Sequence, residues 1–85
     1  MARIYGTVTC SECDLSNTDT ELRFTKSGNS VEEDVKDGKY STDLPRGEYS
    51  VTLDCPGNGW VGVTPGSIRV GTRPKKIDFT SNCGN

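Results

Sequence analysis

The sequence predicts an all-β domain of about seven short strands, arranged as a two-sheet sandwich in preference to a small barrel. Three observations support this. Apolar and polar residues alternate with a period of two in several short stretches, and turn-forming residues, including 10 Gly and 4 Pro, separate them. No stretch shows convincing helical periodicity. The 85 residues suit a single domain over residues 1–85.

The clearest pattern is a pair of strands within residues 38–55, joined by a turn that contains Pro45 and Gly47. Proline presets φ for such a turn, and glycine supplies a permissive backbone. One set of residues in each strand shares a face: Tyr40, Thr42 and Leu44 in the first, and Tyr49, Val51, Leu53 and Cys55 in the second. Only Cys55 in this stretch is chemically reactive, so the pair has an architectural role.

The other stretches with strand character lie on both sides of this pair. Residues 31–35 are the weakest, because strict alternation would place Glu33 beside Val31 and Val35. An edge strand or a β-bulge would resolve that conflict. The remaining predicted strands are residues 3–10, 21–26, 60–70 with an interruption at Pro65-Gly66, and 75–81.

Composition limits the size of the core and the classes of partner. Hydrophobic residues make up 31% of the chain and the mean hydropathy is -0.62, so the core is thin. A domain of this size buries only about 60% of its unfolded surface and needs an additional staple. The net charge is -2, and only residues 73–76 form a basic run, which we interpret as a solvated loop-to-strand junction. No nucleic-acid partner is expected.

No apolar run is long enough for a membrane span or for the core of a signal peptide. We therefore expect no membrane span. We also expect either synthesis in a cytosol or a chain whose targeting segment has been removed.

Several short motifs occur along nearly the whole chain: I-x-G-x-V in residues 3–9, D-G-x-Y in residues 37–40, L-P-x-G-x-Y-x-V in residues 44–51, Pro56-Gly57 with Trp60, and the closing strand at residues 77–79. Together they resemble the motifs of carboxypeptidase regulatory-like domains. The resemblance implies a seven-stranded, prealbumin-like (Ig-like) β-sandwich of Greek-key type, as in collagen-adhesin B-type repeats and transthyretin-like domains. It also implies a non-catalytic spacer, stalk or interaction module, usually within larger extracellular proteins. The chain differs from that pattern in standing alone and in having four cysteines.

The four cysteines are expected to gather at one pole of the domain. Cys10, Cys55 and Cys83 each end the inward face of a predicted strand, the first, fifth and seventh. If successive strands alternate in direction, these three strands end at the same pole, where Cys13 lies in a loop. The sequence therefore predicts a sulfur staple at that pole.

The chemistry of this staple has three alternatives. A structural zinc would use the thiolates of all four cysteines, with Cys10 and Cys13 as the C-x-x-C pair. Two disulfides could form instead, with Cys10 or Cys13 joined to each of Cys55 and Cys83 as the favoured arrangement, and the sequence does not choose among the three connectivities. Unlinked core thiols are the third alternative. A reducing cytosol favours zinc, whereas the extracellular setting of the similar domains favours disulfides.

Nothing in the sequence indicates catalysis or a cofactor other than this zinc. The chain has no His, which removes the usual general base and the usual ligand of a catalytic metal. The acids Glu32, Glu33 and Asp34 are adjacent, so on a strand they point to alternate faces. Asp14, Asp19 and Glu21 lack the spacing of a calcium loop. We predict that the chain is not an enzyme.

The sequence therefore favours a non-catalytic structural or interaction module with a protein partner. An accessory, decoration or cement subunit of a virion or of an extracellular surface assembly is the concrete hypothesis. The alternative is a carbohydrate- or surface-binding adhesion module that uses Trp60, Tyr5 and Tyr40. For Trp60 itself, a place in the core is the favoured interpretation, and an anchor for a partner is the alternative.

Overall fold

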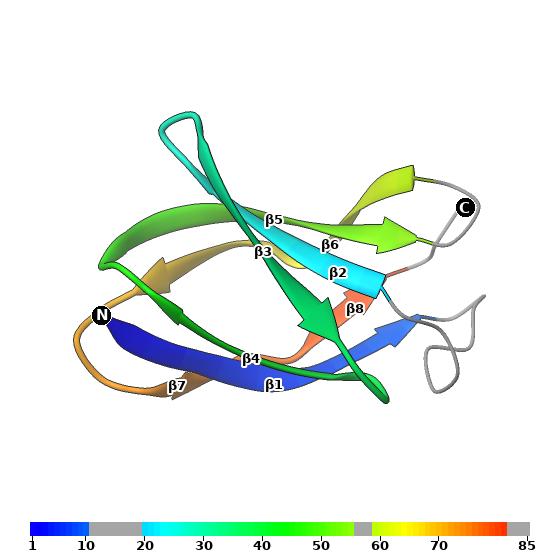
Figure 1. Cartoon of the computed structure of the whole chain (residues 1–85), viewed down its shortest axis with the longest axis horizontal. Coiled ribbons are helices and arrows are strands. Elements are labelled where there is room, and N and C mark those ends of the chain that lie inside the picture. The colour runs from blue at the N-terminus through cyan, green and yellow to red at the C-terminus, as the bar shows by residue number, and fades with distance from the viewer. Residues whose placement is uncertain (11–19, 56–58, 82–85) are drawn as a thin grey trace.

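A computed structural model describes residues 1–10, 20–55 and 59–81 of the chain, and these residues form eight strands (Figure 1). The fold is all-β, as the sequence predicts. The strands are β1 (Ala2–Cys10), β2 (Thr20–Lys26), β3 (Asn29–Val35), β4 (Lys39–Leu44), β5 (Gly47–Cys55), β6 (Gly59–Val70), β7 (Lys75–Lys76) and β8 (Phe79–Ser81). No helix in the described part of the chain is long and apolar enough to cross a membrane.

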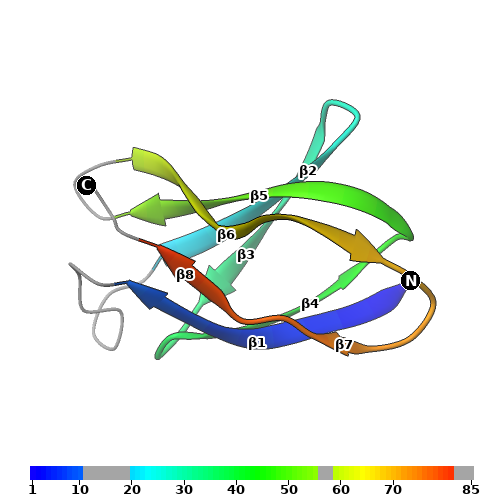
Figure 2. The same ribbon diagram turned by 180° about the vertical axis from the view of Figure 1, so that it is seen from behind.

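The strands follow one continuous path in the order β3-β2-β5-β6-β8-β1-β4, with β7 added beside β1 (Figure 2). The path closes on itself almost like a barrel, and the described chain is flattened, with extents of 34 × 23 × 17 Å. The sequence predicts two separate sheets. In the structure, the pairing of Thr64 in β6 with Thr80 in β8 connects the strands into one path.

Alternation places the predicted inward residues in the core. Leu22, Phe24, Val51, Leu53 and Cys55 are all at most 2% exposed. The rings of Phe24, Tyr40 and Phe79 form a cluster at the centre, with centroids 5.6–6.4 Å apart. These contacts join strands β2, β4 and β8, which are distant in the sequence.

The β2–β3 hairpin turns through two residues, Ser27 and Gly28, which both have positive φ (49° and 83°). Such two-residue turns match the natural twist of a hairpin and fix its register. Strand β3 lies at the end of the strand path, as an edge strand, which confirms the prediction for residues 31–35. The register also resolves the conflict there: Val35 is buried, whereas Val31, near the hairpin tip, is 39% exposed.

The predicted last strand, residues 75–81, is divided into β7 and β8 by a short segment that lies against β1. In this segment the Ile77 amide donates to the Tyr5 carbonyl at 2.8 Å, and the Ile77 carbonyl accepts from the Tyr40 hydroxyl at 2.6 Å. The Asp78 carboxylate accepts from the amide (2.9 Å) and hydroxyl (3.1 Å) of Thr7. The hydrogen bond from the Thr7 backbone amide is the main cause that holds the pKa of the Asp78 carboxylate below its usual value.

This close approach requires glycine at position 6. A Cβ atom on Gly6 would contact the backbone carbonyl of Ile77 and would lie 2.8 Å from the Asp78 carboxylate. The backbone carbonyl cannot move without breaking the bonds of the segment. Gly6 therefore allows residues 77–78 to seat on β1.

We expect Gly6→Ala to lower the free energy of unfolding by about 1–3 kcal/mol, the usual cost of overpacking a tight site. The matched control is Gly71→Ala, because a Cβ at Gly71 would meet nothing within 4 Å. Chemical denaturation of both variants and the unchanged protein measures the difference. Equal stability of the two variants would show that residues 77–78 do not seat on β1 in this way.

Candidate functional site

The strand directions bring the ends of three strands to one pole of the domain. Strand β8 runs parallel to β1 and antiparallel to β6, and β6 runs antiparallel to β5. Strands β1, β5 and β8 therefore all point the same way, and their last residues are Cys10, Cys55 and Ser81 (Figure 1). For Cys10 and Cys55, this is the common pole that the alternation of strand directions predicts.

Cys10 is half-buried and Cys55 is 1% exposed, and both are disulfide-bonded in the structure. The other two predicted members of the staple, Cys13 and Cys83, lie outside the described residues. A sulfur in a disulfide is not a thiolate, so zinc binding would require the reduced form of Cys10 and Cys55. No group of three or more metal-binding side chains occurs in residues 1–10, 20–55 and 59–81. The four-cysteine zinc site stays a prediction.

The most distinctive surface is the outward side of β3, β2, β5 and β6, which we call the outer face. The register sets Glu32 opposite Arg23, Arg23 opposite Thr52, and Thr52 opposite Gly62. The next row, one step toward the hairpin tip, contains only hydroxyl side chains. The outer face includes Glu21, Arg23, Thr25, Ser30, Glu32, Asp34, Ser50, Thr52, Asp54, Trp60, Gly62 and Ser67.

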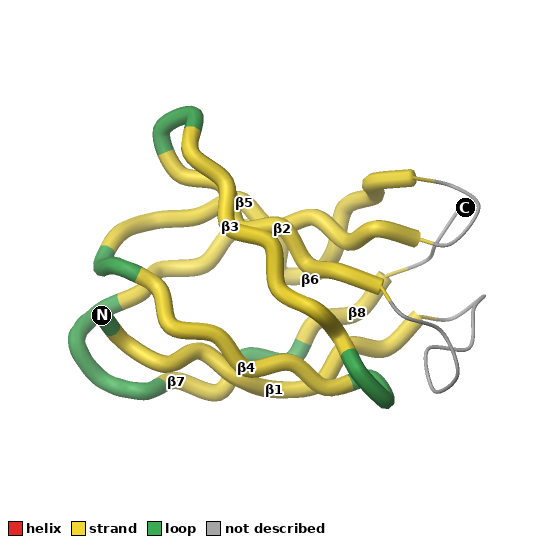
Figure 3. Tube along the Cα trace, in the orientation of Figure 1, coloured by secondary structure: helices red, strands yellow, loops and turns green. Residues whose placement is uncertain are grey.

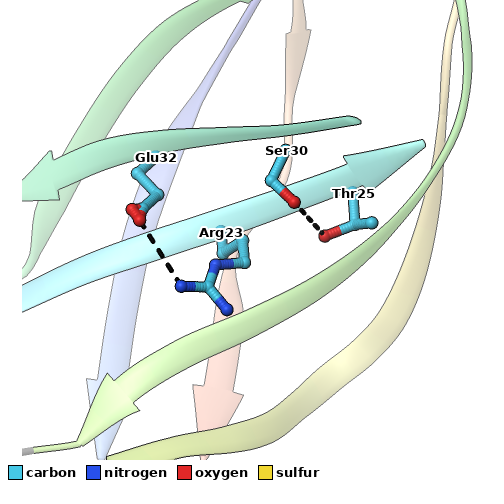
Figure 4. Close-up of polar contacts among 4 residues, drawn as sticks. All are labelled: Arg23, Thr25, Ser30 and Glu32. Carbon is cyan, nitrogen blue, oxygen red and sulfur yellow. Dashed lines mark hydrogen bonds and ion pairs between the residues drawn. The ribbon is translucent and has the colours of Figure 1, made fainter. Parts of the chain in front are cut away.

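Three side chains form a ladder across the outer face. The guanidinium carbon of Arg23 lies 3.8 Å from the centroid of the Trp60 ring, and Arg23 also pairs with Glu32 at 3.4 Å (Figure 4). The ladder therefore connects β6 to the edge strand β3 across β5 and β2.

Trp60 is 37% exposed and does not belong to the buried core. The favoured interpretation of Trp60 as a core aromatic is therefore wrong. The physical reason is register: Trp60 pairs with Asp54, whose neighbours Leu53 and Cys55 point inward, so both Trp60 and Asp54 point outward. An exposed indole stacked on a guanidinium offers a large, partly apolar contact surface with a charge beside it.

Hydroxyl groups flank this ladder. Thr25 and Ser30 face each other on β2 and β3, with their oxygens 3.1 Å apart (Figure 4). Ser50 lies opposite Thr25, and Ser67 lies opposite Ser50. The outer face thus presents a row of hydroxyl groups on short side chains, which can donate and accept hydrogen bonds, beside one aromatic ring.

The three-aromatic platform of Trp60, Tyr5 and Tyr40 does not form, and that prediction is wrong in its detail. Tyr40 is 5% exposed and packs in the core, where burial is the main cause that raises the pKa of its hydroxyl. Tyr5 is 40% exposed but belongs to β1, between β4 and β7. Only Trp60 lies on the outer face.

The acidic and basic runs do not form a catalytic pair or an extended basic face. Glu32 and Asp34 lie opposite Arg23 and Glu21, whereas Glu33 lies opposite the buried Leu22 and so points to the other side of β3. Residues 73–76 are all exposed, and β7 begins within them. Those four residues are the loop-to-strand junction that the sequence predicts.

The ladder itself was beyond prediction from the sequence. Arg23 and Trp60 belong to strands that are separated by β5 in space and by 36 residues in the chain. A cation and an aromatic residue on outward positions were the only available signal, and their pairing depends on two registers that the sequence pattern does not fix.

No family model and no curated protein matches the chain. Solved structures that are similar to it in fold include two DUF3823 family proteins. The one from Parabacteroides merdae has a TM-score of 0.62 at 17% identity, over 93% of this chain and 44% of the other. The one from Bacteroides ovatus has a TM-score of 0.59 at 20% identity, over 92% and 43%. The chain spans less than half the length of each, and the likeness concerns the fold alone.

We expect the unreduced chain to have a mass about four hydrogens below that of the fully reduced chain, as two disulfides require. Reduction should lower the free energy of unfolding by about 2–5 kcal/mol, because cross-links matter most in small domains with thin cores. Intact mass spectrometry and denaturation, each with and without reductant, measure both effects. A zinc adduct in the native mass spectrum, together with destabilisation by a chelator, would contradict the disulfide account.

Proposed function

We propose that the chain is a non-catalytic structural or interaction module that binds a protein partner through its outer face. The observation that carries the proposal is the position of Trp60, the chain's sole Trp, which lies exposed on a sheet face and stacks with Arg23. Tryptophan and arginine are the residues most often responsible for binding energy at protein interfaces.

The arrangement of the ladder supports binding without a large change in shape. Arg23 is already held on both sides, by the Trp60 ring and by the Glu32 carboxylate. Side chains that are ordered before binding lose less entropy when a partner covers them. The hydroxyl row beside the ladder supplies hydrogen-bonding groups at the rim of such an interface.

The non-catalytic part of the proposal is supported by a chain that has no His and by the alternate directions of Glu32 and Glu33. The finer assignment of the fold, a prealbumin-like sandwich similar to carboxypeptidase regulatory-like domains, also belongs to the proposal. It is supported by the motifs in residues 3–9, 37–40 and 44–51 and by the flattened shape of the domain. The setting we propose is a virion or an extracellular surface assembly, where disulfides persist.

A carbohydrate ligand is the second candidate, and the outer face gives it one specific support. Sugars stack on exposed aromatic rings and hydrogen-bond to nearby hydroxyl and charged groups. Trp60 with Thr25, Thr52 and Arg23 provides both kinds of contact on one face. Only one ring is available, so an extended glycan would find a single stacking position.

We expect Trp60→Ala to weaken binding to the partner assembly at least about tenfold, since it removes the central aromatic anchor. Binding of the purified protein to virions or surface assemblies of its source, followed by biolayer interferometry, measures the effect. Tyr5→Ala is the matched control, because Tyr5 is 40% exposed but lies on β1. It should leave binding unchanged.

Two outcomes would contradict the protein-partner proposal. One is equal binding of the Trp60→Ala and unchanged proteins. The other is saturable binding on a glycan array that quenches the fluorescence of Trp60 and disappears in Trp60→Ala, which would favour the carbohydrate candidate.

A further inference from the structure

The nearly closed strand path has one open seam, between the free edges of β3 and β4. The two strands are joined by residues 36–38, where Lys36 and Lys39 exchange two backbone hydrogen bonds of 2.9 Å. Beyond this bridge, β3 and β4 diverge and no described residue pairs one with the other (Figure 3). We define the seam as residues 30–35 of β3, the adjoining Lys36, and residues 39–43 of β4.

The register shows which backbone groups face the seam. In the two-residue hairpin, Lys26 and Asn29 are a hydrogen-bonded pair, so the amides of Ser30, Glu32 and Asp34 point away from β2. Lys36 continues this series and bonds to Lys39 across the seam, which agrees with the assignment. Strand β3 therefore presents a row of backbone donors and acceptors along its open edge.

Two hollows lie at the two ends of the seam. The first is an open groove of 410 Å³ near residues 36–38, lined by Glu33, Asp34, Lys36, Lys39, Tyr40 and Ser41. The second is a groove of 210 Å³ between the hairpin tip and the β4–β5 turn, and its lining includes Val31, Pro45 and Tyr49. The seam thus has room beside the open edge of β3 and an apolar contact at its far end.

The negative charge along the open edge of β3 favours a partner strand with basic side chains. Strand β3 carries three adjacent acids, Glu32, Glu33 and Asp34, within a chain of net charge -2. Pairing of β3 with β3 of a second copy would place these acids against each other, which is unfavourable. A strand with basic side chains would meet opposite charges at the same positions, while its backbone completed the ladder.

We infer that the open edge of β3 accepts an extended, basic segment of a partner protein by β-strand addition. Main-chain hydrogen bonds to Ser30, Glu32 and Asp34 supply the affinity, and Lys or Arg side chains beside the acids supply the specificity. An apolar residue of the segment contacts Val31 in the hollow near the hairpin tip. This surface differs from the Trp60 ladder, although both include Glu32, so the two sites are distinguished by the Trp60→Ala variant, which leaves the seam intact.

The test uses the full chain and a synthetic peptide of alternating lysine and valine. We expect binding with a dissociation constant below about 1 mM, weakened by salt, and slower hydrogen exchange at the amides of Glu32 and Asp34. A peptide that is N-methylated at every second residue loses its donors on one edge and should bind at least about tenfold more weakly. A peptide of alternating glutamate and valine should not bind.

A variant of the edge provides the second arm. Asp34→Pro removes an amide that faces the seam, and an edge strand tolerates proline at such a position. It should abolish binding of the lysine–valine peptide, whereas Gly71→Ala, which lies outside the seam and whose added Cβ would meet nothing within 4 Å, should leave binding unchanged. Equal affinity of the methylated peptide, unchanged binding in Asp34→Pro, absence of binding by the lysine–valine peptide, or a dimer of the chain in sedimentation would each overturn the inference.

Discussion

The structure depends on the contact between β1 and the segment that joins β7 to β8. The strand path runs from β3 through β6 on one side and from β1 to β4 on the other, and β8 is the strand that connects these two parts. Residues 77 and 78 fasten that connection through bonds to Tyr5, Thr7 and Tyr40. Because the chain has a thin core, the partly buried bond from the Tyr40 hydroxyl to the Ile77 carbonyl and the backbone bond from Ile77 to Tyr5 help to hold the domain closed, whereas the bonds from Thr7 to Asp78 are exposed to solvent.

This closure sets the direction of the strands and so the polarity of the domain. Once β8 lies parallel to β1, the ends of β1, β5 and β8 fall at one pole, where Cys10 and Cys55 form disulfide bonds. The opposite pole carries the β2–β3 hairpin and the β4–β5 turn. The closure leaves the seam between β3 and β4 as the open part of the strand path (Figure 3). It also leaves the outward side of β2, β3, β5 and β6 without a further strand over it in the described part of the chain.

Much of the fold could be predicted from the period-two pattern, because burial on one face imposes it directly on the sequence. Leu22 and Phe24 in β2, Tyr40 in β4, and Tyr49, Val51, Leu53 and Cys55 in β5 occupy the inward positions that alternation gives. The site could not be predicted in the same way. Trp60 points outward because of its pairing with Asp54, and its ring contacts Arg23 across β5. This contact depends on registers between distant strands, which composition and spacing do not encode.

Hydrogen exchange measured residue by residue by NMR tests the closure most directly. The amide of Ile77, bonded to Tyr5, and the amide of Val8, bonded to the Gly38 carbonyl at 2.7 Å, should exchange only when the whole domain unfolds. The amides of Glu32 and Asp34, at the open edge of β3, should exchange much faster in the free protein. If the Ile77 amide exchanged as fast as those edge amides, residues 77–78 would not hold the two parts of the fold together, and the account would be wrong.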